Sequence, residues 1–475
     1  MPDRILLPLI VACALFMENL DSTVLSTALP AIARDFGESP IHLKLALTSY
    51  LLAIAVFIPA SGWLADRFGA RAIFRLAILT FTVGSILCGF SSSIATIVGA
   101  RVIQGIGGAM MVPVGRLVIL RTVPKSQLVG SLAWLTVPAL IGPVVGPPIG
   151  GFITTYFAWQ WIFWINIPVG VLGLTLATLF IPDVRGDSRT GFDGLGFVLS
   201  SLGLALFMTG STTLGLEILP RPLVLAILAS GGILLFGYVV HSRRVASPLV
   251  DLSLLSIHSF RMSMIGALLF RLGVGATPFL LPLLLQVGFG LTPFESGSIT
   301  FASAVGAIVL KFVAPPLLRR HGFRTVLVIN SFIASGFVAL PAFFTAQTPV
   351  ALMTGLLFIG GFFRSLQFTS INALNFADVP PERMSRATTL TSVAQQLSLS
   401  VGISVGAITL ELTTRYGGGA MTIDSFRPAF IVVALLSLVS ALPFLRLAHD
   451  AGEEMSGHRR PPLAPDPVTV MRERG

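Results

Sequence analysis

Two acidic residues inside an apolar stretch are the side chains of this sequence best placed to do chemistry. Glu18 and Asp21 lie within residues 5–30, which are long and apolar enough to cross a bilayer, a distance of about 20 residues. Burying an ionised carboxylate in hydrocarbon costs several kcal/mol, so such a group normally faces a cavity, a partner or a transported ion. Three residues apart, the two acids share one helix face. Two interpretations are open here: a structural ion pair with a buried arginine, or a proton-binding site.

The composition indicates the environment of these acids. Of 475 residues, 54% are hydrophobic and only 11% are charged, against about 25% in soluble domains, which predicts a polytopic all-α membrane protein. Cys13 and Cys88 both fall inside predicted spans and cannot form a disulfide framework. The six histidines lie in or beside loops, so we expect no metal site within the membrane.

Apolar segments along the chain predict fourteen membrane-spanning helices, the first of which we interpret as an uncleaved helix and not a signal peptide. They are residues 5–29, 45–63, 74–90, 94–120, 129–153, 162–181, 192–213, 222–241, 262–286, 296–316, 325–345, 350–376, 387–411 and 428–447.

The basic residues predict the orientation of these helices. Most of the 31 Lys and Arg residues fall in loops on the side of the two termini, and cytoplasmic loops carry such an excess. The predicted loops on the other side contain Arg34, Lys44, Arg221, Arg415 and Arg427. We therefore expect both termini in the cytoplasm. The net charge of +10 follows from this topology, so nucleic-acid binding is not needed to explain it.

An internal repeat divides the chain. Residues 62–74 read GWLADRFGARAIF and residues 315–327 read PPLLRRHGFRTVL, which aligns Gly69 with Gly322 but replaces Asp66 by Arg319. Two similar loops, each after the second helix of a six-helix block, predict a duplicated bundle of 6+2+6 helices with a two-helix insertion. Transporters are often built from such repeats, with the substrate site between them.

This repeat predicts how the chain divides into domains. It comprises an N-terminal six-helix bundle (1–182), a two-helix insertion and linker (183–260), a C-terminal six-helix bundle (261–448) and a disordered cytoplasmic tail (449–475). The tail is polar and rich in Pro and Arg, a composition typical of disorder.

Four segments carry a resemblance to a known family. Residues 62–74 resemble the loop motif of the major facilitator superfamily between its second and third helices. LDSTVLSTALP (20–30), RVIQGIGGAMMVP (101–113) and GPVVGPPIGG (142–151) resemble motifs of its fourteen-helix drug:proton antiporter branch. The resemblance covers nearly the whole chain except the tail, and it is closest to one group of multidrug transporters. It implies the major facilitator fold and a transporter of the bacterial inner membrane.

The resemblance also assigns roles to particular residues. It links Arg101 to proton coupling, and helix geometry places Arg101 and Asp21 within roughly one turn in depth, at 1.5 Å per residue. We expect Arg101 to pair with Asp21 or Glu18. Two acids and one base leave one carboxylate under-compensated and able to exchange a proton. A permanent structural bridge is the alternative.

Other motif residues are expected to act on conformation and not on substrate. In the loop motif, Asp66 can accept from helix N-terminal amides, while the arginines can reach acids on neighbouring helices. The resemblance implies that this loop stabilises one access state of the transporter. The second copy lacks the acid, which puts the same role there in doubt. Prolines and glycines near residue 146 are implied to bend a helix that seals one face of the cavity. These conformational residues are Gly62, Asp66, Arg67, Gly69 and Arg71, and Gly142, Pro143, Gly146, Gly150 and Gly151.

Polar residues in the C-terminal spans are candidates for a substrate cavity. They form stripes on otherwise apolar helices, although interhelical hydrogen bonds would explain some of them equally well. With one residue from the N-terminal half, the candidates are Gln104, Arg271, Arg364, Gln367, Asn372 and Gln395. We expect Arg116 and Lys311, near the cytoplasmic ends of their spans, to extend toward the membrane surface.

Together with these residues, the resemblance implies a proton-coupled antiporter that exports small molecules, several drugs among them. A positive C-terminal wall keeps open the alternative of an exporter dedicated to an organic anion or a metal chelate. A membrane enzyme is disfavoured because no Ser/His/Asp set or second carboxylate cluster is present. An ATP-driven pump is disfavoured because none of the three lysines lies in a G-K-[ST] loop. We expect no cofactor and no resident metal. The expected partners are protons, a small-molecule substrate and the lipid bilayer, not nucleic acid, and we expect a monomer.

Overall fold

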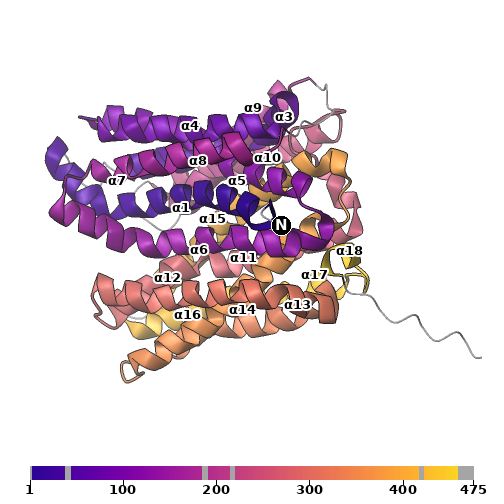
Figure 1. Cartoon of the computed structure of the whole chain (residues 1–475). Helices are drawn as coiled ribbons and strands as arrows, with labels where there is room; N and C mark the ends of the chain where they lie inside the picture. The colour runs from indigo at the N-terminus through magenta and orange to yellow at the C-terminus, as the bar shows by residue number, and fades with distance from the viewer. Residues whose placement is uncertain (1–2, 38–43, 184–190, 214–219, 417–421, 458–475) are drawn as a thin grey trace, which may run out of the picture.

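The computed structural model of the chain describes residues 3–37, 44–183, 191–213, 220–416 and 422–457. No described residue lies in a β-strand, and the long helices run side by side along one common direction (Figure 1). The described ends, Asp3 and Gly457, lie at the same end of the bundle. We call that end the termini side and the other end the far side.

The helices of the N-terminal half come first along the chain. They are α1 (Asp3–Phe36), α2 (Lys44–Phe57), α3 (Ser61–Phe68), α4 (Ala70–Gly89), α5 (Ile94–Thr122), α6 (Lys125–Tyr156), α7 (Trp161–Trp164) and α8 (Asn166–Phe180). Two further helices follow, α9 (Gly194–Thr213) and α10 (Arg221–Ser242). The C-terminal half contains α11 (His258–Gly275), α12 (Thr277–Leu283), α13 (Pro293–Ala339), α14 (Val350–Ala377), α15 (Met384–Tyr416), α16 (Ile423–Val439), α17 (Ala441–Leu445) and α18 (Glu453–Ser456).

Twelve helices in the described part of the chain are long and apolar enough to cross a membrane. Each coincides with one of the fourteen predicted spans. The two remaining predicted spans fall on α6, a helix of 32 residues, and on the first leg of α13, where Glu295–Leu310 is apolar but shorter. All-helical architecture is what a bilayer requires, because a helix satisfies its own backbone hydrogen bonds.

The internal repeat is visible in the backbone at two glycines. Gly69, between α3 and α4, has φ 92°, and Gly322, inside α13, has φ 73°. Both values are in the region that glycine adopts without a Cβ penalty. At Gly322 the backbone leaves helical geometry, so α13 consists of two helical legs joined at this residue. The two residues aligned from sequence therefore make equivalent turns in the two halves.

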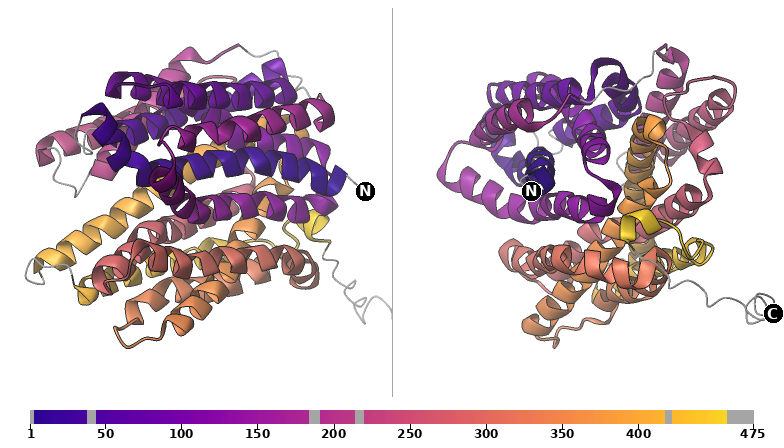
Figure 2. Two further views of the ribbon diagram at one scale, coloured as in Figure 1. Left: turned by 60° about the vertical axis from the view of Figure 1, so that its left-hand side comes forward. Right: turned by 45° about the vertical axis from the view of Figure 1, so that its right-hand side comes forward.

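Helices α9 and α10 form a pair that contacts both halves. The Ser201 hydroxyl on α9 donates to the Val56 carbonyl of α2, and the Ser404 hydroxyl on α15 donates to the Ser211 carbonyl over 2.7 Å. The right-hand view of Figure 2 shows the pair beside α15, at the edge of the molecule. This position agrees with an insertion between two bundles, although the exact domain boundaries stay a prediction.

The two halves meet closely on the termini side. The Ser385 hydroxyl at the start of α15 donates to Asp66 of α3, and the hydroxyls of Ser61 and Thr389 lie 3.5 Å apart. A Cβ added at Gly62 would lie 2.9 Å from the Ser385 carbonyl oxygen. The structure is thus a conformation in which α3 and α15 close the termini side.

The beginning of the predicted tail differs from the expectation of disorder. Glu453–Ser456 form α18, which packs against α6 with Met455 only 2% exposed. The Glu454 carboxylate accepts from the Lys125 ammonium over 2.6 Å. Burial of one methionine between the halves explains why this polar segment is ordered. Residues 458–475 lie outside the described residues.

Candidate functional site

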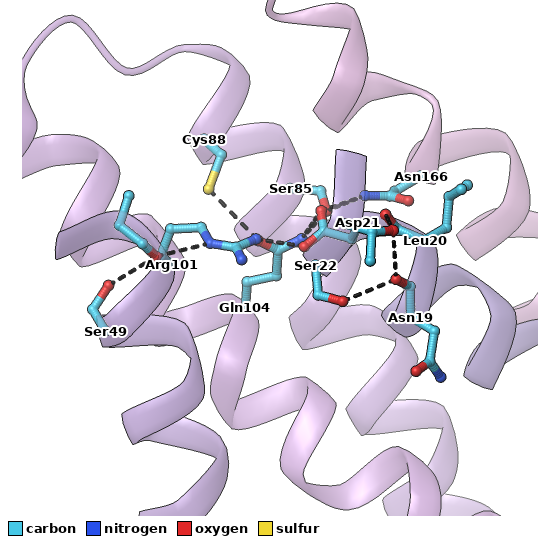
Figure 3. A network of polar contacts seen from close by, with 12 residues as sticks. Asn19, Leu20, Asp21, Ser22, Ser49, Ser85, Cys88, Arg101, Gln104 and Asn166 are labelled. Carbon is cyan, nitrogen blue, oxygen red and sulfur yellow. Dashed lines mark hydrogen bonds and ion pairs between the residues drawn. The ribbon is translucent and has the colours of Figure 1, made fainter. Parts of the chain in front are cut away.

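The Asp21 carboxylate of α1 is the centre of a buried polar network (Figure 3). Asp21 is 3% exposed and pairs with the fully buried Arg101 of α5, whose Nη1 donates to Oδ2. Its other oxygen, Oδ1, accepts from Gln104 Nε2 over 2.8 Å and from Asn166 Nδ2 over 2.9 Å. Three donors from two other helices therefore converge on this carboxylate.

The Arg101 guanidinium is itself held in place by α2. Its Nε donates to the Ala46 carbonyl over 3.2 Å, and its Cζ lies 4.1 Å from the centroid of the Tyr50 ring. Nη1 also donates to Gln104 Oε1 over 2.6 Å. A cation over an aromatic face is attracted by the ring quadrupole, and the attraction is strongest where water is excluded. Arg101 is consequently fixed toward Asp21.

A close helix contact completes the network from α4. Ser85 Oγ accepts from Gln104 Nε2 over 2.6 Å and from Asn166 Nδ2 over 3.2 Å. The neighbouring Gly84 lets α4 approach α5, because an added Cβ would lie 2.6 Å from Gln104 Cα. Such glycine contacts let backbones in membrane bundles pack closely. The sequence segment around Gln104 folds against α4 for this reason.

Glu18 lies one helical turn before Asp21 in a different environment. Its Oε2 is buried and has no hydrogen-bond partner among the described residues. Of the two pairings that the sequence leaves open, the structure therefore has Arg101 with Asp21. Two acids with one neutralising arginine remain, as the charge count from the sequence predicts.

Three residues of this network lie outside the predicted site. Asn166, Ser85 and Tyr50 were missed, although Asn166 was visible as a polar residue inside the apolar segment WIFWINIPVG. Gln104 was predicted to line the substrate cavity. In the structure it is fully buried, and its Nε2 donates to Asp21 and Ser85. The glycine packing of α5 turns it toward α4.

In the C-terminal half, Gln367 also differs from its prediction as a cavity residue. It is fully buried, its Nε2 donates to Ser331 Oγ over 2.8 Å, and its Oε1 accepts from Asn330 Nδ2 over 2.7 Å. These contacts join α14 to the second leg of α13. Gln367 therefore contributes to packing within the half in this conformation.

The other predicted cavity residues make fewer hydrogen bonds than Gln367. Arg271 of α11 is fully buried and donates to Asn372 Oδ1 over 3.0 Å, while Arg364 donates to Ser303 Oγ over 3.0 Å. Gln395 of α15 is half-buried. The prediction that Arg116 extends toward the membrane surface is wrong: Arg116 is 4% exposed and lies over the Phe376 ring, because α14 covers it. The side chain of Lys311 lies outside the described residues.

The residues of the loop motif (62–74) contact other groups than those expected. Asp66 accepts from Arg121 Nη2 over 2.7 Å and from the Ser385 hydroxyl, where helix amides were predicted. Arg71 donates to the Thr178 carbonyl of α8 and not to an acid, and Arg67 is exposed. Asp66 thereby joins an arginine of its own half to a helix of the other half.

The glycines of α6 pack against α1, the helix that carries both acids. A Cβ at Gly142 would lie 2.8 Å from Asn19 Cβ, and one at Gly146 would collide with the Thr23 side chain. Gly150 is buried, whereas an added Cβ at Gly151 would meet open space. The side chain of Pro143 lies outside the described residues. This close contact positions α1, and the predicted sealing role stays a prediction.

No group of three or more His, Cys, Asp or Glu side chains that could hold a metal ion occurs in the described part of the chain.

Residues 11–257 and 263–472 match the model of the Major Facilitator Superfamily. The chain belongs to this superfamily. It is 38% identical over 449 residues to a Pectobacterium atrosepticum protein named "Putative multidrug resistance protein MdtD", with 93% of this chain and 95% of that relative covered. A Salmonella paratyphi B protein of the same name is 36% identical over 466 residues, with 95% and 96% covered.

Solved structures of the superfamily share the fold at low sequence identity. The human organic anion transporter MFSD10 superposes with a TM-score of 0.65 at 15% identity, covering 94% of this chain and 100% of that chain. The proton:xylose symporter XylE gives 0.64 at 14% identity, covering 92% and 94%. At these identities the similarity establishes the major facilitator fold alone. Within that fold, the Asp21 network lies in the N-terminal half, between α1, α4, α5 and α8.

Proposed function

We propose that this protein is a proton-coupled antiporter that exports small molecules, several drugs among them, across the bacterial inner membrane. The observation that carries the proposal is the buried Asp21–Arg101 pair one helical turn from Glu18, whose buried Oε2 has no hydrogen-bond partner. The multidrug resistance named for relatives that align over almost their whole length supports the substrate class.

The two acids differ in how they can hold a proton. Asp21 accepts from Arg101, Gln104 and Asn166, and these donors compete with a proton for its two oxygens. Glu18 has one buried oxygen without a donor, and an ionised carboxylate there would cost several kcal/mol, so we infer that Glu18 is the acid better placed to take up a proton in this conformation. Proton transfer to Asp21 would release Arg101 and weaken the contacts between α1 and α5. Proton binding would in this way change helix packing.

The orientation of the chain tells which side of the membrane this conformation closes. We infer from the basic loops that the termini side faces the cytoplasm, and in that orientation α3 and α15 close this conformation toward the cytoplasm. Substrate would bind between the two halves, where alternating access operates in such folds. Each proton that moves inward gains about 2.3 kcal/mol per 100 mV of membrane potential, so no cofactor is required. We propose a monomer as the functional unit.

The test is proton release from energised inside-out vesicles, with a pH dye inside and a cationic dye added outside as substrate. Wild type should release protons when substrate is added, and Asp21→Asn should lose at least nine-tenths of that rate, roughly 1.4 kcal/mol in barrier terms. Asp424→Asn is the matched control, because its side chain is 76% exposed in an ion pair with Arg427.

Glu18→Gln separates the two acids in the same assay. If Asp21→Asn releases protons normally while Glu18→Gln does not, the coupling group is Glu18. Absence of substrate-triggered release from wild type at verified expression, with several cationic drugs, would contradict proton antiport.

A further inference from the structure

The Arg101 guanidinium has a second point of attachment besides Asp21, and it lies on a different helix. Asp21 belongs to α1, whereas Arg101 Nε donates to the Ala46 carbonyl of α2 over 3.2 Å. On the same helix, the centroid of the Tyr50 ring lies 4.1 Å from Arg101 Cζ. Ala46 and Tyr50 are four residues apart and share one face of α2. Arg101 therefore lies between an acid on α1 and a carbonyl and an aromatic ring on α2.

The Tyr50 ring is held in place by close packing. Tyr50 is 2% exposed, and its ring packs edge-to-face on Phe81 of α4 with the centroids 6.4 Å apart. Two glycines of α5 leave room for it. An added Cβ would lie 2.7 Å from the Tyr50 carbonyl oxygen at Gly105, and 3.1 Å from the Tyr50 hydroxyl at Gly108. These glycines of the segment 101–113 thus bring α2 against the arginine of the same segment.

The ring of Tyr50, and not its hydroxyl, acts on Arg101. The hydroxyl oxygen is buried and has no hydrogen-bond partner among the described residues. A ring face attracts a cation most strongly where water is excluded, and Arg101 is fully buried. When Asp21 is ionised, its charge neutralises the guanidinium. When Asp21 is neutral, the remaining contacts of the cation are those with α2 and with Gln104 of its own helix.

We propose that Tyr50 is a positioning residue that holds Arg101 on α2 when Asp21 takes up a proton. This inference rests on the proposed proton coupling at Asp21. Proton uptake would remove the ion pair between α1 and α5 but leave α2 and α5 joined through Arg101. Because the ring stabilises the unpaired cation, it also makes protonation of Asp21 easier.

Few other groups near this pair can titrate. Glu18 lies one turn away on α1, and Cys88 of α4 donates to Gln104, the neighbour of Arg101 in the network. Helices α7 and α8 carry no titratable residue, and α6 carries none between its terminal residues Lys125 and Tyr156.

The first test asks whether Tyr50 matters more when residue 21 has no charge, and it does not require transport. Asp21→Asn imitates the protonated acid. Thermal unfolding midpoints of the purified full-length chain are measured for Tyr50→Leu alone and combined with Asp21→Asn. The loss caused by Tyr50→Leu should be roughly twofold larger in the Asp21→Asn background, because the cation then depends on the ring. Tyr50→Phe keeps the ring and should cost little in either background.

Phe74→Leu is the matched control for this comparison. It removes another fully buried ring of the N-terminal half, one that packs near Gly115 and Val11. Its cost should be the same with Asp21 and with Asn at that position. A difference as large as that of Tyr50→Leu would show that loss of any buried ring is enough, and would overturn the proposal.

The second test measures proton release from the purified protein in weakly buffered detergent solution when the cationic drug tetraphenylphosphonium is added. The pH of half-maximal release should fall by about one unit in Tyr50→Leu, a tenfold loss of proton affinity. Tyr50→Phe and Phe74→Leu should keep the wild-type value. A role of Tyr50 in stability alone would lower the unfolding midpoint without moving this pH.

The two tests fail in different ways. Equal losses for Tyr50→Leu in both backgrounds, or an unchanged pH of half-maximal release, overturn the role of Tyr50. Absence of release from wild type contradicts the proposed proton coupling instead, and the unfolding comparison then still decides whether the ring holds Arg101. If Tyr50→Leu with Asp21→Asn fails to fold while Phe74→Leu with Asp21→Asn folds, the proposal is supported. If neither combination folds, the pH of release in the single variant Tyr50→Leu decides.

Discussion

Asn166, at the start of α8, donates a 2.9 Å hydrogen bond to Asp21, which is 145 residues earlier in the chain. The same amide reaches Ser85 on α4, so a single side chain joins three helices around the buried acid. With Arg101 and Gln104 on α5, the contacts of Asp21 and Ser85 join four helices of the N-terminal half, and Arg101 also contacts Ala46 and Tyr50 of α2. Any change in the charge of Asp21 is therefore transmitted to all four.

Replacing Asn166 by leucine should destabilise the protein. The change removes one of three donors to Asp21 and one of two donors to Ser85, which we expect to cost about 1–3 kcal/mol. Thermal unfolding in detergent measures the effect. Asn19→Ala is the matched control, since the Asn19 amide donates only within its own helix, to the Leu15 carbonyl. Equal midpoints for the two variants would contradict the structural role of Asn166.

Removing Arg101 should cost more than removing its partner. Arg101→Met leaves the Asp21 charge buried without its cation, which we expect to cost about 3–5 kcal/mol. The double variant Asp21→Asn with Arg101→Met should recover a large part of this loss, because no charge then remains unpaired. The four unfolding midpoints form a double-mutant cycle, and additive effects would show that the two side chains do not interact.

The contact between α4 and α5 predicts opposite outcomes for two glycines. Gly84→Ala should destabilise the fold by about 1–3 kcal/mol, because the added Cβ meets the Gln104 backbone. Gly99→Ala, in the neighbouring helix α5, meets nothing within 4 Å and should be neutral or stabilising. Unfolding midpoints measured side by side test the pair; if Gly84→Ala is as stable as Gly99→Ala, the close contact is not present.

Asp66 should control the closure of the termini side. Asp66→Asn weakens the contacts to Arg121 and Ser385, and losing a charged hydrogen bond of this kind costs about 1.5–3 kcal/mol. The population open on this side should rise by about ten- to hundredfold. Spin labels at the exposed positions Arg67 and Glu382 would report a longer distance in this variant. Asp450→Asn, an exposed acid on the same side, should leave the distance distribution unchanged.

Stability at acid pH should depend on Asp251, which lies in the segment between α10 and α11. Its carboxylate accepts from Ser253 and forms ion pairs with Arg383 and Arg386. Burial raises the pKa of Asp251, but hydrogen bonds from Ser253 and Arg383 outweigh it and hold that pKa below its ordinary value of 3.8. A carboxyl group with a lowered folded-state pKa stabilises the protein above its ordinary pKa and loses that contribution as pH falls through the folded value.

Asp251→Asn should therefore lower the unfolding midpoint at neutral pH, and its difference from wild type should shrink below about pH 4. Unfolding scans of both proteins across this range make the test. A difference that stays constant down to the lowest pH at which wild type folds would mean that ionisation of Asp251 contributes nothing.

The helices and the Asp21–Arg101 pair could be predicted from the sequence for physical reasons. Apolar length fixes which segments cross the bilayer, and the fixed helical rise sets the depth of each charged residue along its span. The sequence does not show how each helix is rotated about its axis. For that reason Gln104 and Gln367 were assigned to a cavity, although both point into helix contacts. The prediction for Arg116 was wrong because Phe376, the ring that lies against its guanidinium group, belongs to a helix of the other half.

The turns at Gly69 and Gly322 match in backbone geometry but not in charge. The first carries Asp66 and binds α15 through it, whereas the second has Arg319 at the aligned position. Two turns of the same backbone geometry thus differ in the contact that they can make with the other half. The two repeats are therefore not interchangeable, because the acid that contacts the opposite half is in the first repeat and the aligned position of the second has a base.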